Sequence, residues 1–321
     1  MTQTAPEDAQ STFSGTREVD PRYALDEAAL DRWLVANVEG YAGPLTVRQF
    51  KGGQSNPTYQ LITPGRKYVL RRKPPGKLLP SAHAVDREFR VLQALHGGPA
   101  PVARPLHLCT DETVVGSMFY LMAFVDGRIF WDPSLPDATP AERTAIYGGI
   151  IDAMAALHTL DPAAVGLADF GKPGNYFERQ LRRWTEQYRA SETQAIPAMD
   201  ALIERLPARC PADDGRASLV HGDFRLDNLM FHPTEARVLA VLDWELSTLG
   251  HPLADFSYHC MAWHISPGTF RGIGGLDLAA LGIPSEAEYI RRYCERTGFT
   301  TPEALAKDWN FYLAYNMFRI A

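Results

Sequence analysis

The feature that most constrains this chain is one β-rich stretch, SLVHGDFRLDNLMFHPTEARVLAVLDWE, at residues 218–245 of a region that otherwise reads as helical. It contains the pattern H-G-D-x-x-x-x-N, whose fixed positions are His221, Gly222, Asp223 and Asn228. An apolar run then ends in Asp243. From average residue usage, such a match is expected in roughly one in a thousand chains of this size. The pattern therefore favours a functional loop over a tight turn followed by a strand end.

These residue types match the requirements of phosphoryl transfer. A carboxylate must orient the attacking hydroxyl group and accept its proton, while a second carboxylate and an amide oxygen hold magnesium against the β- and γ-phosphates. We expect Asp223 to be the catalytic base, and Asn228 and Asp243 to be the metal ligands. His221 is expected to brace the loop backbone, since a histidine in such a turn more often has that role.

The sequence before residue 126 predicts an antiparallel sheet with helices. Short runs of β-branched or aromatic residues occur at 45–50, 57–63 and 67–72, and further runs lie near 103–109 and 118–125. A helix is expected over about 83–96, where apolar residues recur at helical spacing, and an earlier helix should begin at Asp26. The expected sheet therefore has five strands.

The sequence after residue 126 predicts mostly helices. The connector from Asp126 to Pro140 is rich in Pro and Gly, and it ends in a capping box formed by Thr139 and Glu142. Further helices are expected near 175–190, 196–206 and 285–297, and from Pro302 to the chain end. The last helix has no terminating signal, so we expect the natural polypeptide to continue it. The expected organisation is a flexible segment at 1–22, a nucleotide-binding lobe at 23–125 and a helical catalytic and substrate lobe at 126–321.

On these residues the chain resembles the aminoglycoside phosphotransferase superfamily of small-molecule kinases, over about residues 45 to 320. The resemblance implies an α+β, two-lobed protein-kinase-like fold, with a five-stranded antiparallel N-terminal sheet plus a helix and a mostly helical C-terminal lobe. It implies the same roles for the H-G-D aspartate, the asparagine and the later aspartate. Gly250 and Asp255 match a further family element, G-x-x-x-x-D. Asp255 is expected to be buried and hydrogen-bonded, tying down the catalytic loop without a direct part in chemistry.

The resemblance also implies an ATP site in the first lobe. A Gly-rich turn lies between two strands and consists of Gly52, Gly53, Gln54, Ser55 and Asn56. Such a turn lets backbone N–H groups approach phosphate oxygens, although taken alone it is more often a plain hairpin. FYLMAFVDG (119–127) resembles the hinge between lobes, where the adenine edge would pair with the C=O of Ala123 and the N–H of Val125, with Met122 behind the ring. The same letters also fit a buried edge strand.

A kinase of this type needs a cation on the third strand, paired with a carboxylate on the following helix, to grip the phosphates. The matching positions are Arg71 and Glu88. The family usually has lysine where this chain has Arg71, and Lys73 lies two residues on, on the same strand face. A guanidinium group is longer and planar, so the phosphate contact must differ. The sequence leaves open which cation contacts phosphate, and a surface basic strand is the alternative.

Composition narrows the partners. The 321 residues include 45% apolar and 22% charged residues, with a formal net charge of -6, so the chain offers no basic field for nucleic acid. Four cysteines without a C-x-x-C pair predict neither disulfides nor a cysteine-rich zinc site. No secretory signal or membrane-length apolar run is visible, so a cytoplasmic protein without membrane association is expected.

The expected cofactors are ATP and Mg²⁺, and the expected partner is a small hydroxylated acceptor. An enzyme for polycationic aminoglycosides should present acidic C-terminal helices, but residues 257–321 hold six acids and six bases. Residues 68–92, YVLRRKPPGKLLPSAHAVDREFRVL, most resemble the branch found with acyl-CoA dehydrogenases, which implies a hydroxyacyl-CoA or similar acceptor. The alternatives are a regulatory pseudokinase, an antibiotic phosphotransferase and a metal-dependent hydrolase.

Overall fold

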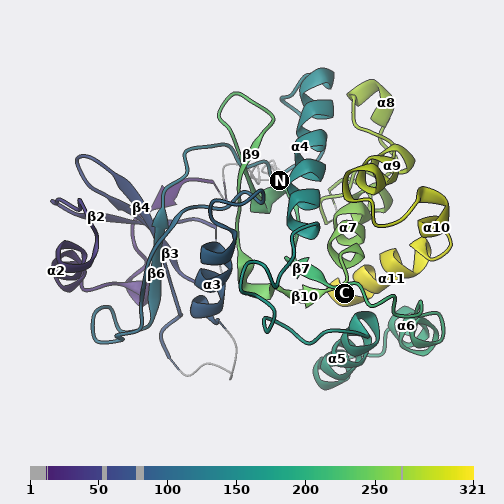
Figure 1. Cartoon of the computed structure of the whole chain (residues 1–321), viewed down its shortest axis with the longest axis horizontal. Helices are drawn as coiled ribbons and strands as arrows, with labels where there is room; N and C mark the ends of the chain where they lie inside the picture. Colours follow the sequence, from purple (N-terminus) through teal and green to yellow (C-terminus); the bar gives the residue numbers. More distant parts are fainter. Residues whose placement is uncertain (1–11, 13, 53–55, 77–82, 269) are drawn as a thin grey trace, which may run out of the picture. The chain divides into compact units, whose positions relative to one another are not determined.

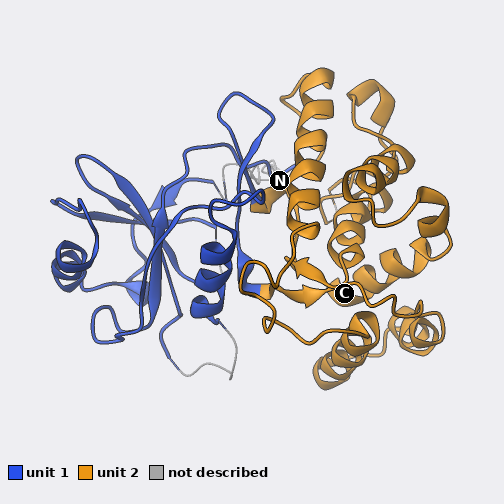
Figure 2. Ribbon diagram, in the orientation of Figure 1, with its two compact units in different colours: residues 1–132, 229–245 blue, residues 133–228, 246–321 orange. Residues whose placement is uncertain are grey.

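The computed structural model describes residue 12 and residues 14–52, 56–76, 83–268 and 270–321. The chain divides into two compact units (Figure 2). Unit 1 comprises residues 1–132 and 229–245, and unit 2 comprises residues 133–228 and 246–321. Among the described residues, no helix combines the length and the apolar character needed to cross a membrane.

Unit 1 is built on an antiparallel sheet whose described residues form six strands in the order β1-β2-β3-β4-β6-β5. The strands are β1 (Thr16–Arg17), β2 (Thr46–Phe50), β3 (Thr58–Ile62), β4 (Lys67–Arg72), β5 (Pro105–Cys109) and β6 (Phe119–Ala123). Five of them lie where the sequence predicts strands. The sixth strand, β1, lies inside the segment 1–22 that was expected to be flexible. It pairs with Gln49 and Phe50 of β2. A strand of two residues is too short to show an alternating pattern in the sequence. Residues 1–11 and 13 of the same segment lie outside the described residues.

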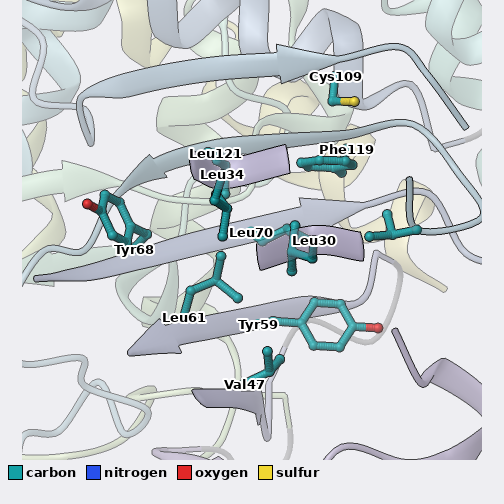
Figure 3. Packing of buried hydrophobic residues seen from close by; sticks show 11 residues of the cluster. Leu30, Leu34, Val47, Tyr59, Leu61, Tyr68, Leu70, Cys109, Phe119 and Leu121 are labelled. Carbon is teal, nitrogen blue, oxygen red and sulfur yellow. The ribbon is translucent and has the colours of Figure 1, made fainter. Parts of the chain in front are cut away.

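One face of this sheet is an apolar core (Figure 3). Alternate residues of neighbouring strands point to this face, and they include Tyr59, Leu61, Leu70, Phe119 and Leu121. Helix α2 (Glu27–Asn37) covers them with its fully buried Leu30 and Leu34. Its predicted N-cap is confirmed, since the Asp26 side chain accepts a hydrogen bond from Ala29 N. Burying a leucine side chain contributes roughly 2 kcal/mol, so this face anchors the sheet.

The opposite face of the sheet positions polar groups. Arg71 alternates with Leu70 on β4, and its cross-strand neighbour Tyr120 alternates with Phe119 and Leu121 on β6. Helix α3 (Val85–Leu95) lies on this side, across the sheet from α2 (Figure 1). It buries Phe89 against the Tyr120 ring, with 5.8 Å between the ring centroids. The pleat therefore directs Arg71 toward α3.

The hairpin of β8 (Leu229–Phe231) and β9 (Val238–Val241) belongs to unit 1, although it is distant in sequence from the sheet. Phe231 and Arg128 exchange two backbone hydrogen bonds of 2.8 Å, and Val241 N donates to Pro101 O at 2.9 Å. These long-range bonds join the hairpin to the chain around β5 and β6. Local sequence patterns cannot show such long-range bonds, so the sequence predicts the hairpin as part of the lobe at 126–321. The functional lobes expected at 23–125 and 126–321 stay a prediction.

Unit 2 is mainly helical. Its helices are α4 (Pro140–His158), α5 (Tyr176–Ser191), α6 (Pro197–Ala208), α7 (Leu253–Cys260), α8 (Leu278–Leu281), α9 (Glu286–Thr297), α10 (Pro302–Ala306) and α11 (Trp309–Ile320). A small antiparallel pair, β7 (Ser218–Val220) and β10 (Thr248–Gly250), accompanies them. The described residues also form four 3-10 helices: η1 (Pro21–Tyr23), η2 (Leu226–Asn228), η3 (Trp244–Leu246) and η4 (Met261–His264). The predicted capping box of Thr139 and Glu142 at α4 is confirmed.

Unit 2 differs from the prediction in its last two helices and at α7, and its short elements α8 and β10 were also not expected. The prediction of a single helix from Pro302 is wrong, because the helix is interrupted at Lys307 and Asp308, between α10 and α11. Both helices bury apolar side chains, so the apolar pattern in the sequence continues across the interruption. Helix α7 was not predicted, because every one of its eight residues is buried. A helix buried on all sides shows no amphipathic period.

His259 on α7 makes the stability of the protein depend on pH. Burial lowers the pKa of His259 to about 4, from an ordinary value of 6.5. Its neutral ring is hydrogen-bonded to the Tyr289 hydroxyl at 3.1 Å. A depressed pKa stabilises the folded state above pH 6.5, and this contribution is lost as the pH falls toward 4. Between pH 7 and pH 4.5 the loss is on the order of 2–3 kcal/mol.

We therefore expect the His259→Gln variant to be less stable than the wild type at pH 7, and the difference to shrink by roughly 2–3 kcal/mol at pH 4.5. Urea unfolding followed by circular dichroism at both pH values measures this difference. A difference that does not change with pH would show that His259 does not carry the effect.

Candidate active site

The H-G-D loop follows β7 in unit 2, and its backbone needs glycine. Gly222 has a φ of +86°, in the left-handed region. A Cβ atom at this position would lie 2.6 Å from the carbonyl oxygen of Leu246. Any other residue would therefore combine backbone strain with a steric clash. The loop then turns through η2 to reach Asn228.

The buried carboxylate of Asp255 anchors the backbone of this loop. Asp255 on α7 is fully buried and accepts hydrogen bonds from the backbone N–H groups of His221 at 2.6 Å and Gly222 at 2.8 Å. His158 Nε2 lies 3.3 Å from the same carboxylate, and His158 Nδ1 lies 2.8 Å from the Tyr293 hydroxyl. Burial alone would raise the pKa of Asp255, but the bonds from His158 and Gly222 outweigh it and hold the pKa below its usual range. The expected burial and hydrogen bonding are observed, and the functional role stays a prediction.

The loop brings the predicted base, Asp223, and one predicted metal ligand, Asn228, into direct contact. Asn228 Nδ2 donates to Asp223 Oδ2 at 3.0 Å and to the Asp223 carbonyl oxygen at 2.9 Å. Since the Nδ2 atom of Asn228 is engaged in these bonds, its amide oxygen is the atom suited to a cation. The Asp223 side chain is 20% exposed. It combines a fixed orientation with access for a reacting group.

Two further residues that the sequence analysis did not single out contact the Asp223 carboxylate. The Tyr258 hydroxyl donates to Oδ1 at 2.6 Å, and Arg225 Nη2 lies 3.0 Å from Oδ2. Tyr258 lies three residues after Asp255, one turn along α7, so its position could be inferred only if that helix were known. Arg225 lies inside the H-G-D-x-x-x-x-N pattern itself. Both oxygens of Asp223 are therefore oriented by side chains of unit 2.

The predicted cation and carboxylate pair of unit 1 is observed. Arg71 Nε lies 2.8 Å from Glu88 Oε2, and both side chains are buried. Tyr120 donates to Glu88 Oε2 at 3.1 Å and Asn56 Nδ2 donates to Glu88 Oε1 at 2.8 Å. Burial raises the pKa of Glu88 to about 7, although the Arg71 guanidinium opposes this shift. The surface basic strand that the sequence left open is therefore wrong for Arg71, which is buried and paired.

Arg71 also contacts the predicted metal ligand of unit 1. Its Nη2 atom donates to Asp243 Oδ1 and lies 3.7 Å from Glu245 Oε2. Burial opposes the charge on Arg71, but the carboxylates of Glu88 and Asp243 outweigh it and raise its pKa. Asp243 has a φ of +63°, which is uncommon for a residue other than glycine and is one of the backbone conformations that cluster at functional sites. Arg71 thus lies among three carboxylates.

The remaining predicted nucleotide contacts also fall in unit 1. Gly52 and Asn56 flank Gly53, Gln54 and Ser55, which lie outside the described residues. Asn56 is fully buried and its side chain donates to Glu88, so the structure gives it a bracing position inside unit 1, and its contact with phosphate stays a prediction. Met122 and Ala123 end β6, and Val125 follows the strand. In the described sheet β6 lies between β4 and β5, so it is not the edge strand that its letters also allowed.

The donor types fit magnesium better than a transition metal. Within the described part of the chain, no group of three or more His, Cys, Asp or Glu side chains is arranged to hold a metal ion. Magnesium does not need such a cage, because it keeps several waters and is usually held by one or two carboxylates with substrate phosphates. The Asp243 side chain is 28% exposed and offers a carboxylate of this kind. In Asn228 the amide oxygen remains for the same use.

Comparisons with known proteins agree with these features. The model of the phosphotransferase enzyme family matches residues 46–306. Acyl-CoA dehydrogenase family member 10 of Mus musculus is 47% identical over 310 residues, which are 95% of this chain and 28% of that protein. The chain therefore spans less than a third of the length of this relative.

Two solved structures share the fold. A Ralstonia eutropha protein provisionally named an aminoglycoside phosphotransferase is 59% identical, with a TM-score of 0.83 over 92% of this chain and 87% of that one. A thermostable mutant of an aminoglycoside phosphotransferase, in a ternary complex with AMP-PNP and hygromycin B, is 16% identical with a TM-score of 0.58, over 90% of this chain and 88% of that one. The second likeness concerns the fold alone, which is the expected α+β protein-kinase-like fold. Because the family model matches most of its residues, the chain belongs to the phosphotransferase enzyme family.

Proposed function

We propose that this protein is an ATP-dependent phosphotransferase that phosphorylates a hydroxyl group of a small molecule. The observation that carries the proposal is the double orientation of the Asp223 carboxylate, by Tyr258 on one oxygen and by Asn228 and Arg225 on the other. In the reaction, Asp223 accepts the proton of the acceptor hydroxyl group as the oxygen forms a bond to the γ-phosphorus of ATP. The bond between that phosphorus and the bridging oxygen breaks, and ADP leaves.

The proposed ATP contacts come from unit 1. Arg71, held by Glu88, is suited to the α- and β-phosphates. As the sequence predicts, the Gly-rich segment from Gly52 to Asn56 would supply backbone contacts with phosphate oxygens. The adenine edge would bind the backbone of Ala123 and Val125. A solved structure with the same fold contains AMP-PNP, which supports ATP as the cofactor.

Magnesium would supply charge neutralisation at the β- and γ-phosphates when bound. We assign Asn228 and Asp243 as its protein ligands. Arg71 contacts the same Asp243 carboxylate, so the guanidinium group and the cation compete for one anionic group. Arg71 therefore orients the carboxylate in the absence of the cation.

The acceptor is the finer part of the proposal. We propose a hydroxyacyl-CoA or a related hydroxylated acyl compound, supported by the similarity to acyl-CoA dehydrogenase family member 10. The equal numbers of acids and bases in residues 257–321 argue against a polycationic aminoglycoside. A regulatory pseudokinase would have lost the base or a metal ligand, whereas all three residue types are present here.

An ATP-consumption screen tests the proposal. The panel contains hydroxyacyl-CoAs, amino alcohols, sugars and aminoglycosides, each with and without magnesium. Turnover that requires both magnesium and a hydroxylated acceptor supports a kinase. ATP binding without turnover on any acceptor would support the pseudokinase, and acceptor-independent hydrolysis would support the hydrolase.

Arg71 and Lys73 can be distinguished by kinetics. We expect Arg71→Lys to raise the KM for ATP about 10-fold, because a single ammonium cannot keep Glu88 and a phosphate in the geometry of the planar guanidinium group. Lys73→Met serves as the matched variant and is expected to change this KM less than about twofold. The reverse order would assign the phosphate contact to Lys73.

Tyr258 can be tested with an isosteric change. We expect Tyr258→Phe to lower kcat about 10-fold, because Asp223 loses the donor that fixes its Oδ1 atom. Tyr289→Phe is the matched control, since its hydroxyl group is buried but bonds to His259 on α7 instead of the loop. Equal kcat values for both variants would show that Tyr258 has no positioning role.

A further inference from the structure

Arg319 on helix α11 contacts the H-G-D loop of unit 2. Its Nη2 atom donates a hydrogen bond to the carbonyl oxygen of Gly222. The same guanidinium group lies over two aromatic rings, 4.9 Å from the ring centroid of Tyr258 and 5.8 Å from that of Trp184. Both distances are within the range of a cation–π contact. Arg319 therefore joins α5, α7 and α11 to the loop that carries Asp223.

The carbonyl group of Gly222 belongs to the peptide unit that precedes Asp223. Because a peptide unit is planar, holding this carbonyl oxygen also fixes the direction of the Asp223 N–H group and the position of its Cα atom. The N–H group of Gly222 donates to Asp255 at 2.8 Å. Glycine restricts its own backbone little, so these two bonds together hold the turn at its φ of +86°.

The Tyr258 ring connects Arg319 to the same aspartate by a second route. The Tyr258 hydroxyl group donates to Asp223 Oδ1 at 2.6 Å. The guanidinium group packs on the face of this ring, so it limits the positions that the hydroxyl group can take. Arg319 thus restrains both the backbone before Asp223 and a hydrogen-bond donor to its carboxylate.

Helix α11 is itself fixed against α7 (Figure 1). Asn316 on α11 is fully buried, and its Nδ2 atom donates to the carbonyl oxygen of Ala254 at 3.1 Å and to Ser257 Oγ at 2.7 Å. Residues three positions apart lie on the same side of a helix, so Arg319 follows Asn316 on the side that packs on α7. The guanidinium group therefore starts from an anchored part of the fold.

We propose that Arg319 is a positioning residue for phosphoryl transfer, which orients Asp223 through the Gly222 carbonyl group and the Tyr258 ring. This inference rests on the proposed function, because it takes Asp223 as the base. Arg319 transfers no proton in this role and acts only through the residues that it contacts. A base held in one orientation reacts faster than a mobile one, so loss of Arg319 should lower kcat and leave nucleotide binding intact.

Two substitutions and one control test this role. Arg319→Met removes the guanidinium group but keeps a long side chain, and Arg319→Lys keeps the charge on a single nitrogen atom. Arg189→Met is the matched control, because Arg189 also lies over an aromatic ring, 5.7 Å from the centroid of Tyr188, but its side chain is 45% exposed on α5. Circular dichroism establishes whether each variant is folded.

Hydrogen exchange of the H-G-D loop provides a measurement that does not need turnover. Mass spectrometry of peptides that cover residues 219–228 is expected to show exchange about 5-fold faster in Arg319→Met than in the wild type. Arg319→Lys should lie between the two, and Arg189→Met should match the wild type. Unchanged exchange in Arg319→Met would overturn the proposal. Loss of the fold in both Arg319 variants would also overturn it, because the role of Arg319 would then be structural alone.

Kinetics connect the loop to the reaction. With an acceptor from the ATP-consumption screen, Arg319→Met is expected to lower kcat about 10-fold, while the KM for ATP stays within about twofold of the wild type. Arg319→Lys should recover part of kcat. An unchanged kcat, or an effect confined to a KM, would contradict a positioning role. A lack of turnover by the wild type with every acceptor would refute the proposed function, while hydrogen exchange would still decide whether Arg319 holds the loop.

Discussion

Replacing Asp223 with asparagine is expected to lower kcat by roughly 10²- to 10⁴-fold, the contribution typical of a general base. The substitution keeps the size and planarity of the side chain but removes its ability to accept a proton. The loop should keep its shape, because Asp255 holds it through the backbone of His221 and Gly222 instead of through Asp223. ATP binding is therefore expected to stay within about twofold of the wild type.

Single-turnover kinetics and nucleotide titration together test this expectation. Asp137→Asn, which changes an exposed acid elsewhere in unit 2, is the control for nonspecific effects. A variant that keeps more than about a tenth of wild-type turnover would refute the assignment of Asp223 as the base. Loss of ATP binding in parallel with turnover would instead indicate a structural defect.

The sequence predicted the elements whose patterns are local. The capping box at α4 and the N-cap at α2 depend on side chains a few residues apart, and both are observed. Five strands of the unit 1 sheet alternate or run apolar between clear turn signals. Family resemblance, rather than periodicity, gave the pairing of Arg71 with Glu88, because no short-range pattern joins a strand to the helix that follows it.

The parts that the sequence missed depend on tertiary contacts. Helix α7 has no exposed face: its polar side chains are buried with its apolar ones, so its short sequence does not show the pattern of apolar core side and polar solvent side. Tyr258 therefore gave no sign that it would reach Asp223. Asp227 and Arg271 lie 44 positions apart, and their contact exists only because the loop after η4 folds back to η2. Strand β1 has two residues and is defined by its partner β2.

Arg71 on β4 contacts two carboxylates with different proposed roles, so a substitution of Arg71 affects both. Arg71 uses Nε for Glu88 and Nη2 for Asp243. A lysine has one nitrogen, so it cannot make both contacts in the same fork geometry. The arginine thus connects the proposed phosphate grip with the proposed metal ligand inside unit 1. A change at either carboxylate, Glu88 or Asp243, therefore also affects the other group that Arg71 contacts.

Replacing Asp243 with alanine is expected to raise the magnesium concentration needed for half-maximal activity at least about 10-fold, and to lower kcat at saturating magnesium. The variant leaves the cation at the β- and γ-phosphates with too few oxygen ligands. Arg71 keeps its ion pair with Glu88, so the fold of unit 1 should persist. Asp243→Asn retains one oxygen and is expected to have an intermediate magnesium requirement.

Magnesium titration of activity at fixed ATP measures this effect. Glu235→Gln is the matched control, because Glu235 is a 58% exposed acid in the hairpin between β8 and β9. Its magnesium midpoint should equal that of the wild type. If the midpoint of Asp243→Ala were also unchanged, Asp243 would only end the strand, and its left-handed backbone would serve the turn into η3. An altered midpoint in Asp243→Ala alone would instead assign the cation to this carboxylate, because the two variants each remove one negative charge from the segment 229–245 of unit 1.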